Sequence, residues 1–222
     1  MSGGLRVAGL TRLSTVDFPG RLAAVVFLQG CPWRCSYCHN PGLIPADAPT
    51  PLTWADASAF LARRRGLLDG VVFSGGEPTL QAALPAAMDE ARALGLQLGL
   101  HTAGMYPDRV AALLPRLDWV GLDIKARDPG LSEVTGVRGG AARVRATLGH
   151  LQASSVDHEC RTTWHPALYP ADELLALADD LAAAGVTRWA VQAARLPGQP
   201  QARVSAELAS ALSARFPHVI LR

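Results

Sequence analysis

The sequence predicts an α/β protein built as a partial (β/α)6 barrel of parallel strands. Six short apolar runs alternate with helix-like segments along its 222 residues, which is typical of parallel strands joined by helical crossovers. A full eight-unit barrel takes about 250 residues, so six units in this length suit an incomplete barrel. Unusual polar residues follow strand after strand, and in barrels the chemistry lies at that rim. A doubly wound open sheet is the competing architecture.

The first half of the chain supplies three of these units. The expected strands are the apolar runs at 22–28, 70–74 and 96–100. Thr53 suits the N-cap of a helix that ends near Arg65, and a longer helix is expected at 79–94, where Gly95 stops it. Residues 5–20 show no clear period, so no element is assigned to them.

The second half repeats the alternation. Further strands are expected at 119–123, 158–163 and 189–192, and residues 218–221 suit a short terminal strand. Helices are expected at 107–114, 170–184 and 205–216, with another that follows the polar, glycine-rich stretch 126–140 and ends near Ala153. No change in composition indicates a linker, so we expect a single domain over residues 1–222.

Bulk composition indicates an ordinary globular protein. Apolar residues make up 49%, charged residues 18%, and the formal net charge of +2 is too small to indicate nucleic-acid binding. Residues 1–4 have no basic-then-apolar signal pattern, and no apolar run approaches the roughly 18 residues of a membrane span. We therefore expect a cytoplasmic protein that binds neither nucleic acid nor a membrane.

Three of the four cysteines, Cys31, Cys35 and Cys38, lie within eight residues soon after the first expected strand. In a reducing compartment such a group indicates metal binding or redox work rather than disulfides. Zinc is one alternative, but a closed site needs four ligands, and His39 follows Cys38 so directly that a chelate would be strained. Iron–sulfur chemistry is the better match, because three thiolates leave one iron open. Cys160 stands alone on an expected strand and suits a small core residue.

The spacing Cys31-x-x-x-Cys35-x-x-Cys38, with Tyr37 before the last cysteine, resembles the signature of radical S-adenosylmethionine (radical SAM) enzymes. A longer set of motifs is similar to one branch, the activating proteins of glycyl-radical enzymes, and within it to the activating protein of anaerobic ribonucleoside-triphosphate reductase. These motifs cover most of the chain and lie at 14–20, 27–31, 37–41, 74–78, 123–125 and 161–163.

The resemblance implies a radical SAM fold and two cofactors. The three cysteines would bind a [4Fe–4S] cluster, whose open iron binds the amino and carboxylate groups of S-adenosylmethionine. One electron then cleaves this cofactor to methionine and a 5′-deoxyadenosyl radical. The radical takes a hydrogen atom from a glycine of a glycyl-radical enzyme, by this resemblance the anaerobic ribonucleotide reductase. Flavodoxin or ferredoxin would supply the electron, and the protein's own task is to position the cofactor and exclude water.

The resemblance also implies which other residues meet the cofactor. Gly75 and Gly76 would let the backbone approach its methionine part, and Glu77 would lie near its ammonium group. Lys125 is assigned to catalysis together with the cysteines, because it would neutralise the cofactor carboxylate or steady electron transfer. The remaining positions expected at the cofactor are Tyr37, His39, Thr102, Asp123 and Arg161.

One departure from the related activating proteins bears on this assignment. Where they often carry Asp-Thr-Asn-Gly, this chain has His101-Thr102-Ala103-Gly104, so a carboxylate and an amide are missing together. The loss weakens the case for a cation site at this rim. It also weakens the case for Thr102 as a cofactor contact.

Two other functions remain open from the sequence. A radical SAM enzyme that acts on a small molecule, such as a 7-carboxy-7-deazaguanine synthase-like protein, would carry the same cysteine motif and would turn over its substrate without a partner protein. A zinc-binding or electron-carrier module is the third alternative. Such a module needs neither the Gly-Gly-Glu-Pro turn at 75–78 nor a rim of polar strand ends.

Overall fold

A mixed sheet of nine strands forms the centre of the computed structural model, within the residues that it describes, which are 4–128, 130–196, 198–199 and 202–222. The strand order is β3-β1-β2-β4-β5-β6-β7-β8-β9. The strands are β1 (Arg6–Ser14), β2 (Ala23–Leu28), β3 (Leu52–Thr53), β4 (Gly70–Gly75), β5 (Gln97–Thr102), β6 (Trp119–Asp123), β7 (Asp157–Trp164), β8 (Trp189–Ala193) and β9 (Val219–Leu221).

Seven strands of this described sheet, β2 and β4 to β9, pair in parallel, as the alternating pattern predicts. The six internal strands expected from the sequence are confirmed, and the terminal run contains β9. The sequence reasoning missed β1 and β3. β1 pairs antiparallel with β2 with register shifts between Val7 and Gly9 and between Thr11 and Ser14. These shifts remove the regular alternation by which a strand is recognised.

The described helices are α1 (Trp54–Arg63), α2 (Leu84–Ala93), α3 (Pro107–Leu113), α4 (Gly130–Thr135), α5 (Gly140–Gln152), α6 (Ala171–Ala183) and α7 (Ala206–Arg215), with 3-10 turns η1 (Pro41–Leu43), η2 (Pro78–Leu80) and η3 (Leu114–Arg116). Thr53 caps α1 in a capping box with Asp56, as expected. The helix predicted at 79–94 is wrong in its first turn, because η2 forms separately and α2 begins only at Leu84. α4 lies inside the stretch 126–140, where the sequence predicts no helix.

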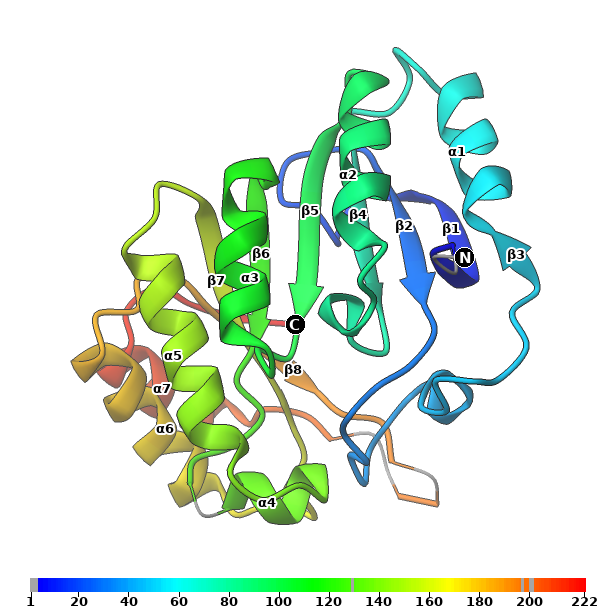
Figure 1. Cartoon of the computed structure of the whole chain (residues 1–222). Coiled ribbons are helices and arrows are strands. Elements are labelled where there is room, and N and C mark those ends of the chain that lie inside the picture. Colours follow the sequence, from blue (N-terminus) through cyan, green and yellow to red (C-terminus); the bar gives the residue numbers. More distant parts are fainter. Residues whose placement is uncertain (1–3, 129, 197, 200–201) are drawn as a thin grey trace.

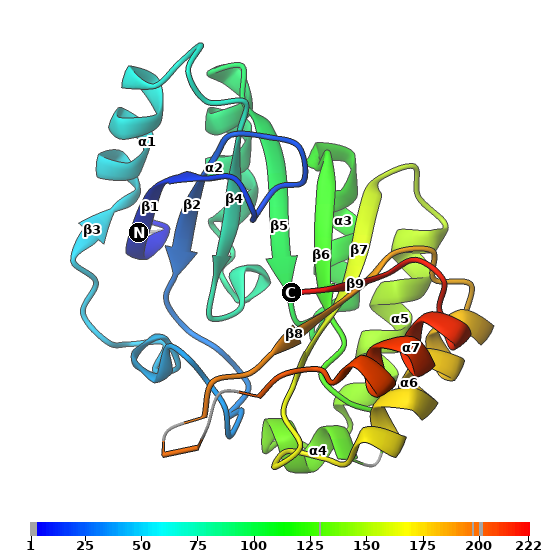
Figure 2. The ribbon, with the colours of Figure 1, turned by 180° about the vertical axis from the view of Figure 1, so that it is seen from behind.

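Helices cover one face of the sheet, and the view from behind shows the strands without a helical layer over them (Figures 1 and 2). The main apolar core lies between the sheet and the helices. A smaller cluster lies on the other face, where Phe18 of the β1–β2 loop stacks with Trp119 at a centroid distance of 5.8 Å. Trp119 begins β6, so the loop fills this face at the amino ends of the strands. The carboxyl ends are left for a site.

None of the described helices is both long enough and apolar enough to cross a membrane. The two longest described helices, α5 and α6, have 13 residues each. Residues 1–3, part of the segment inspected for a signal pattern, lie outside the described residues.

Candidate active site

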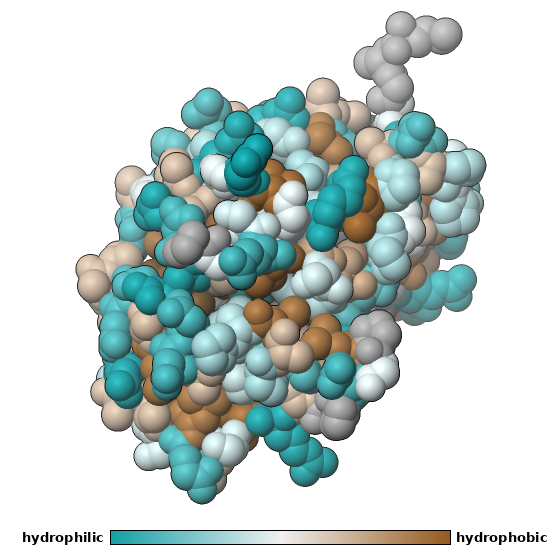
Figure 3. Space-filling model, turned by 90° about the horizontal axis from the view of Figure 1, so that it is seen from below, coloured by the Kyte–Doolittle hydropathy of each residue, from teal (hydrophilic) through white to brown (hydrophobic). Residues whose placement is uncertain are grey.

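A cavity of about 300 Å³ opens at the carboxyl ends of the parallel strands. Its walls come from the β1–β2 loop, from the loop after β2, from the end of β4 and the turn after it, and from side chains on or just after β5 to β8. Figure 3 looks onto this end of the molecule, where hydrophilic and hydrophobic residues are interspersed. Glu77 and Thr102 are not in the lining. The residues expected at the site that do line the cavity are Cys31, Cys35, Tyr37, Cys38, His39, Gly75, Gly76, Asp123, Lys125 and Arg161.

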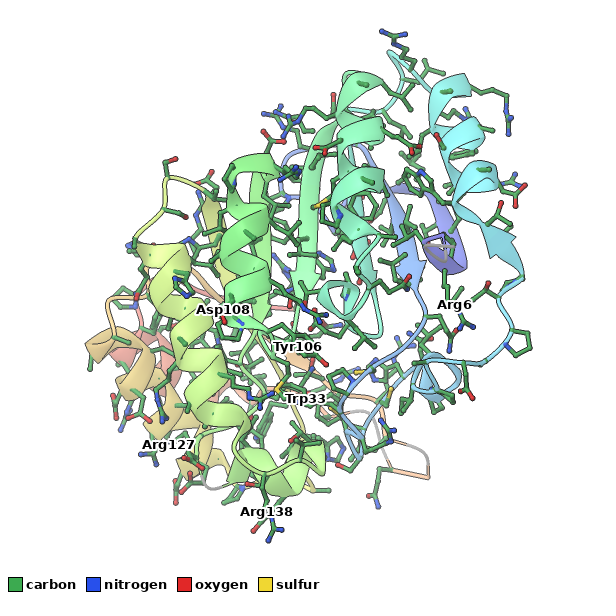
Figure 4. The ribbon with its side chains drawn as sticks, viewed as in Figure 1. Arg6, Trp33, Tyr106, Asp108, Arg127 and Arg138 are labelled. Atoms are coloured by element: carbon green, nitrogen blue, oxygen red, sulfur yellow. The ribbon has the colours of Figure 1, made fainter. Side chains whose placement is uncertain are left out.

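The loop that carries the three cysteines is fixed by backbone hydrogen bonds on both sides. The N–H of Cys31 donates to the carbonyl of Ile44 at 3.1 Å. The N–H groups of Arg34 and Ser36 donate to the last two carbonyls of α4 at 2.8 and 3.1 Å. Trp33, in the middle of this loop, lies between the end of β5 and α4 (Figure 4). The short helix that the sequence reasoning missed therefore supports the cysteine loop.

The three cysteines of the loop are half-buried and form no disulfide. Burial raises the pKa of Cys31 to about 11 and also raises the pKa of Cys35, so metal coordination is needed to make them thiolates. Three thiols from one loop suit a [4Fe–4S] cluster that keeps one iron open, whereas a closed zinc site needs four ligands. Cys160 is buried in the main core, as expected.

Gly75 and Gly76 form the turn at the end of β4. Gly75 has a φ of +116°, and a Cβ there would collide with the backbone of Leu28 on β2. A Cβ on Gly76 would collide with the carbonyl of Gly30 and approach the Cβ of Cys31 to 3.1 Å. Both glycines are therefore needed to pack β4 against the start of the cysteine loop. Their expected role beside the methionine part of the cofactor stays a prediction.

Glu77 follows the two glycines and is completely buried. Its carboxylate accepts hydrogen bonds from Thr79 Oγ1 at 2.6 Å, from Thr102 Oγ1 at 2.8 Å and from the N–H of Ala103 at 2.7 Å. Burial raises the pKa of Glu77, although these donors act in the opposite direction. The carboxylate thus joins the turn after β4 to the end of β5. Cofactor contacts of Glu77 and Thr102 stay predictions.

Asp123, at the end of β6, faces the cavity beside Lys125. Lys125 Nζ donates to Asp123 Oδ2 at 3.0 Å and lies 5.6 and 5.5 Å from the ring centroids of Trp33 and Tyr37. Burial alone would lower the pKa of the ammonium, but Asp123 and other acidic groups nearby hold it well above its usual range. Burial alone would raise the pKa of Asp123, but Lys125 and a nearby arginine lower it. Both groups are therefore charged.

The nearby arginine is Arg161, which approaches Asp123 from β7. Its Nε lies 3.7 Å from Asp123 Oδ1. Arg161 lies inside β7, in register with Asp123 of β6. Its guanidinium reaches the cavity across Gly121, where a Cβ would come within 2.6 Å of Nη2. The glycine on β6 thus makes room for a second positive charge beside the same carboxylate.

His101 packs beside Arg161, and its ring joins three segments of the chain. Nε2 lies 2.9 Å from the carbonyl oxygen of Asp17, and Nδ1 lies 3.3 Å from Ser74 Oγ. Nε2 also lies 3.2 Å from Arg161 Nη1, which can only donate, so the carbonyl and the guanidinium require opposite tautomers of the ring. Burial, reinforced by the charge of Arg161, lowers the pKa of His101 to about 3 and keeps the ring neutral. His101, which stands where the related activating proteins often carry aspartate, therefore links β5 to the β1–β2 loop.

His39 is exposed at the mouth of the cavity and meets Tyr37 edge-on, with ring centroids 6.5 Å apart. The lining residues that sequence reasoning did not assign to the site include Asp17, Ser74, His101, Thr163 and Gln192. Asp17 and Ser74 belong to the motifs at 14–20 and 74–78, which were a usable signal. Thr163 belongs to the motif at 161–163 and His101 to the tract at 101–104, so these two also had a signal, whereas only the register of the parallel strands brings Gln192 to the cavity.

An incomplete parallel barrel whose rim presents three thiols defines a class of enzymes that hold an iron–sulfur cluster at the ends of the strands. A family model described as the Radical SAM superfamily matches residues 25–181, and the chain belongs to this superfamily. The family uses a [4Fe–4S] cluster held by three cysteines together with S-adenosylmethionine. Cys31, Cys35 and Cys38 fit that motif.

Two curated relatives are glycyl-radical-enzyme activases by name. The chain is 28% identical over 188 residues to a Methanocaldococcus jannaschii protein assigned as a glycyl-radical enzyme activating enzyme, a match that covers 76% of this chain and 72% of that protein. It is 36% identical over 137 residues to the pyruvate formate-lyase-activating enzyme of Clostridium pasteurianum, which covers 59% of this chain and 57% of that enzyme. The chain thus spans little more than half of the clostridial enzyme.

Solved structures show the same fold. QueE from Escherichia coli has a TM-score of 0.60 at 17% identity, with 98% of this chain and 93% of that chain covered. SuiB from Streptococcus suis, bound to its precursor peptide SuiA, has a TM-score of 0.68 at 14% identity, with 89% and 48% covered. At these identities the likeness shows the fold alone, and it confirms the α/β architecture predicted from the sequence.

Proposed function

We propose that this protein is a glycyl-radical-enzyme activating enzyme that cleaves S-adenosylmethionine reductively and generates a glycyl radical on a partner. The observation that carries the proposal is the convergence of Cys31, Cys35, Cys38 and Lys125 on one rim cavity. The names of the curated relatives support the same function. When bound, the cluster supplies the electron that breaks the sulfonium bond of the cofactor.

In this proposal the chain's own residues bind the cluster, orient S-adenosylmethionine and shield both from water. The three thiolates hold the cluster. Lys125 and Arg161 place two positive charges in the cavity, which suit a carboxylate group of the cofactor. Asp123 holds both cations in place through its two oxygens. Trp33, which is buried in the cavity wall, limits the access of water to the reacting groups.

We propose the anaerobic ribonucleoside-triphosphate reductase as the partner. Support comes from the sequence motifs at 14–20, 37–41 and 161–163, which are similar to those of its activating protein. Flavodoxin or ferredoxin suits the role of electron donor. Three of the four cysteines are used by the motif and Cys160 is buried in the main core, so the chain has no thiols for a second cluster of its own.

Anaerobic reconstitution with iron and sulfide, followed by dithionite and S-adenosylmethionine, tests the first step. We expect 5′-deoxyadenosine and methionine in equal amounts. Cys35→Ala is expected to abolish both the cluster absorbance and the products. Cys160→Ala removes a cysteine outside the cavity and is the matched control that keeps them. A wild-type protein with full iron and sulfide content but no cofactor cleavage contradicts the proposal.

The partner is tested by offering purified anaerobic ribonucleotide reductase and pyruvate formate-lyase side by side to the reconstituted protein. Electron paramagnetic resonance is expected to show a glycyl radical on the reductase. A radical on pyruvate formate-lyase alone would correct the partner and keep the activating function. Turnover of a small substrate, with no radical on either enzyme, would instead identify a small-molecule radical SAM enzyme.

A further inference from the structure

Lys125 is the single lysine of this chain, because the other 20 of its 21 lysine and arginine residues are arginine. A sequence that uses arginine at every other basic position has no general preference for lysine. A lysine at this one position therefore indicates that an ammonium is needed there. The two groups differ physically, since an ammonium is a compact point charge and a guanidinium is a flat fork of five donors.

The surroundings of Lys125 fit a compact charge. Its side chain is 13% exposed, and Nζ donates to Asp123 at 3.0 Å. The rings of Trp33 and Tyr37 lie 5.6 and 5.5 Å from the same nitrogen, and both residues are buried. Cation–π attraction acts within about 6 Å and strengthens when water is removed. The ammonium is therefore held by three side chains in a setting with little water.

Both rings belong to the cysteine loop. Trp33 lies between the first and second cysteines of the motif, and Tyr37 lies between the second and third. The two rings, the three cysteines and Lys125 line one cavity. The loop's own cation, Arg34, is exposed instead, and it donates to two carbonyls of the loop. The charge of Lys125 thus lies buried beside the loop, whereas the charge of Arg34 is exposed to solvent.

Asp123 does not cancel the positive charge of Lys125. Its carboxylate faces two cations, Lys125 at 3.0 Å and Arg161 at 3.7 Å, so the three groups together carry one net positive charge. The side chains of Lys125 and Arg161 are 13% and 19% exposed, and solvent therefore screens them less than a surface charge. These three groups line the same cavity as the cluster thiolates, together with the carboxylate of Asp17, which accepts a hydrogen bond from Ser14 Oγ at 2.5 Å.

We propose that Lys125 is a positioning residue for electron transfer: a fixed positive charge, clamped to the cysteine loop by Trp33 and Tyr37, that raises the reduction potential of the cluster. The inference rests on the cluster of the proposed function but not on the partner. The cluster accepts one electron from its external donor and gains one negative charge. A cation nearby stabilises that reduced state, and charge and burial near a cluster are known determinants of its potential.

The test is a redox titration of reconstituted wild type, Lys125→Met, Lys125→Arg and Arg34→Gln, followed by electron paramagnetic resonance. The titrations are run without S-adenosylmethionine, so that a role confined to binding this cofactor leaves the midpoint potential unchanged. Lys125→Met keeps the length of the side chain and removes its charge. Arg34→Gln removes one charge from the cysteine loop itself, at an exposed position, which makes it the matched control.

We expect the midpoint potential of Lys125→Met to move to more negative values. Lys125→Arg keeps one positive charge and is expected to show a smaller shift in the same direction, because that charge is spread over a larger group. Arg34→Gln is expected to stay near the wild-type value, because water screens the charge that it removes. A Lys125→Met midpoint equal to wild type, or a shift no larger than that of Arg34→Gln, would overturn the inference.

Trp33→Leu keeps the ammonium and removes one ring of the clamp, so it carries the test if Lys125→Met assembles no cluster. Its midpoint is expected to move in the negative direction as well, and an unchanged midpoint would overturn the inference. The proposed function is separable from this result. A wild-type protein that cleaves no cofactor, yet shows a potential that depends on Lys125, refutes the activity and leaves the inference standing.

Discussion

Two strand ends of the same rim hold a carboxylate in very different ways. Glu77, after β4, is completely buried and accepts hydrogen bonds from Thr79, Thr102 and Ala103. Asp123, at the end of β6, has a side chain that is 34% exposed, lines the cavity and faces two cations. The first carboxylate is satisfied by hydroxyl and backbone groups of the protein. The second is held by charges that a ligand can also reach.

This difference shows that a polar residue at a strand end is not by itself a ligand contact. The internal donors decide the outcome, because a carboxylate that protein groups already satisfy has little left to offer a cofactor. The pKa values follow the same division. Burial raises the pKa of Glu77, whereas the charges of Lys125 and Arg161 outweigh burial and lower the pKa of Asp123. Glu77 therefore joins the turn after β4 to the end of β5, whereas Asp123 lines the cavity.

The largest expected effect is on folding, from Glu77→Ala. The change leaves the donors of Thr79, Thr102 and Ala103 buried without an acceptor, and each such group costs about 1–3 kcal/mol, so we expect a loss of about 3 kcal/mol or more in the free energy of unfolding. Urea denaturation of the cluster-free protein measures it. A loss below about 1 kcal/mol, the range of a surface change, would break the contrast between the two carboxylates.

Thr102→Val tests the burial of Glu77 by removing one of its hydrogen-bond donors. Thr102 Oγ1 donates to Glu77 at 2.8 Å and accepts from the N–H of Gly104 at 3.0 Å, so valine removes both partners while keeping the shape. We expect a loss of about 2 kcal/mol in the free energy of unfolding. Thr102→Ser keeps the hydroxyl and is the control, with an expected loss of about 1 kcal/mol for the one buried methyl group that it removes. Equal losses in the two variants would show that the hydroxyl of Thr102 does not contribute to stability.

Asp123→Asn is expected to act on binding rather than on folding. It releases the cations that the carboxylate holds, so the affinity of the reconstituted protein for S-adenosylmethionine should fall about tenfold, which corresponds to about 1.4 kcal/mol. The unfolding free energy of the cluster-free protein should fall less than in Glu77→Ala, because the side chain of Asp123 is 34% exposed and water can replace part of its contacts. Calorimetry and urea denaturation measure the two quantities. A large loss of stability with unchanged affinity would reverse the roles of the two carboxylates.

The smallest expected effect is a pair of opposite pH dependences. The raised pKa of Glu77 means that its contribution to stability is complete below the usual glutamate value of about 4.3 and is lost as pH rises through the folded-state pKa. The lowered pKa of Asp123 means that its contribution is present above the usual aspartate value of about 3.9 and is lost as pH falls through the folded-state pKa.

Urea denaturation of the cluster-free protein across this pH range separates the two carboxylates. Glu77→Gln should remove the part of the wild-type stability that falls with rising pH. Asp123→Asn should remove the part that rises with pH above the folded-state pKa of Asp123. The same sign in both variants would show that the two environments do not differ as described.

Much of the site could be predicted from the sequence because its signals are local. The three cysteines lie in one loop, and Gly75, Gly76 and Asp123 lie at ends of strands whose apolar runs are recognisable. Arg161 was harder to place, because its access to the cavity depends on a glycine 40 positions away on the neighbouring strand. α4 escaped prediction because it is a six-residue helix in a glycine-rich stretch.

The sequence by itself determined the alternation of strands and helices, the rim on which the polar residues fall, and the three-cysteine motif. These follow from short-range patterns of hydrophobicity and spacing, which the chain carries wherever it folds. Only the tertiary structure decided which polar residues face the cavity. That choice depends on the register of parallel strands and on which donors arrive from other segments, as the buried Glu77 and the cavity-facing Asp123 show.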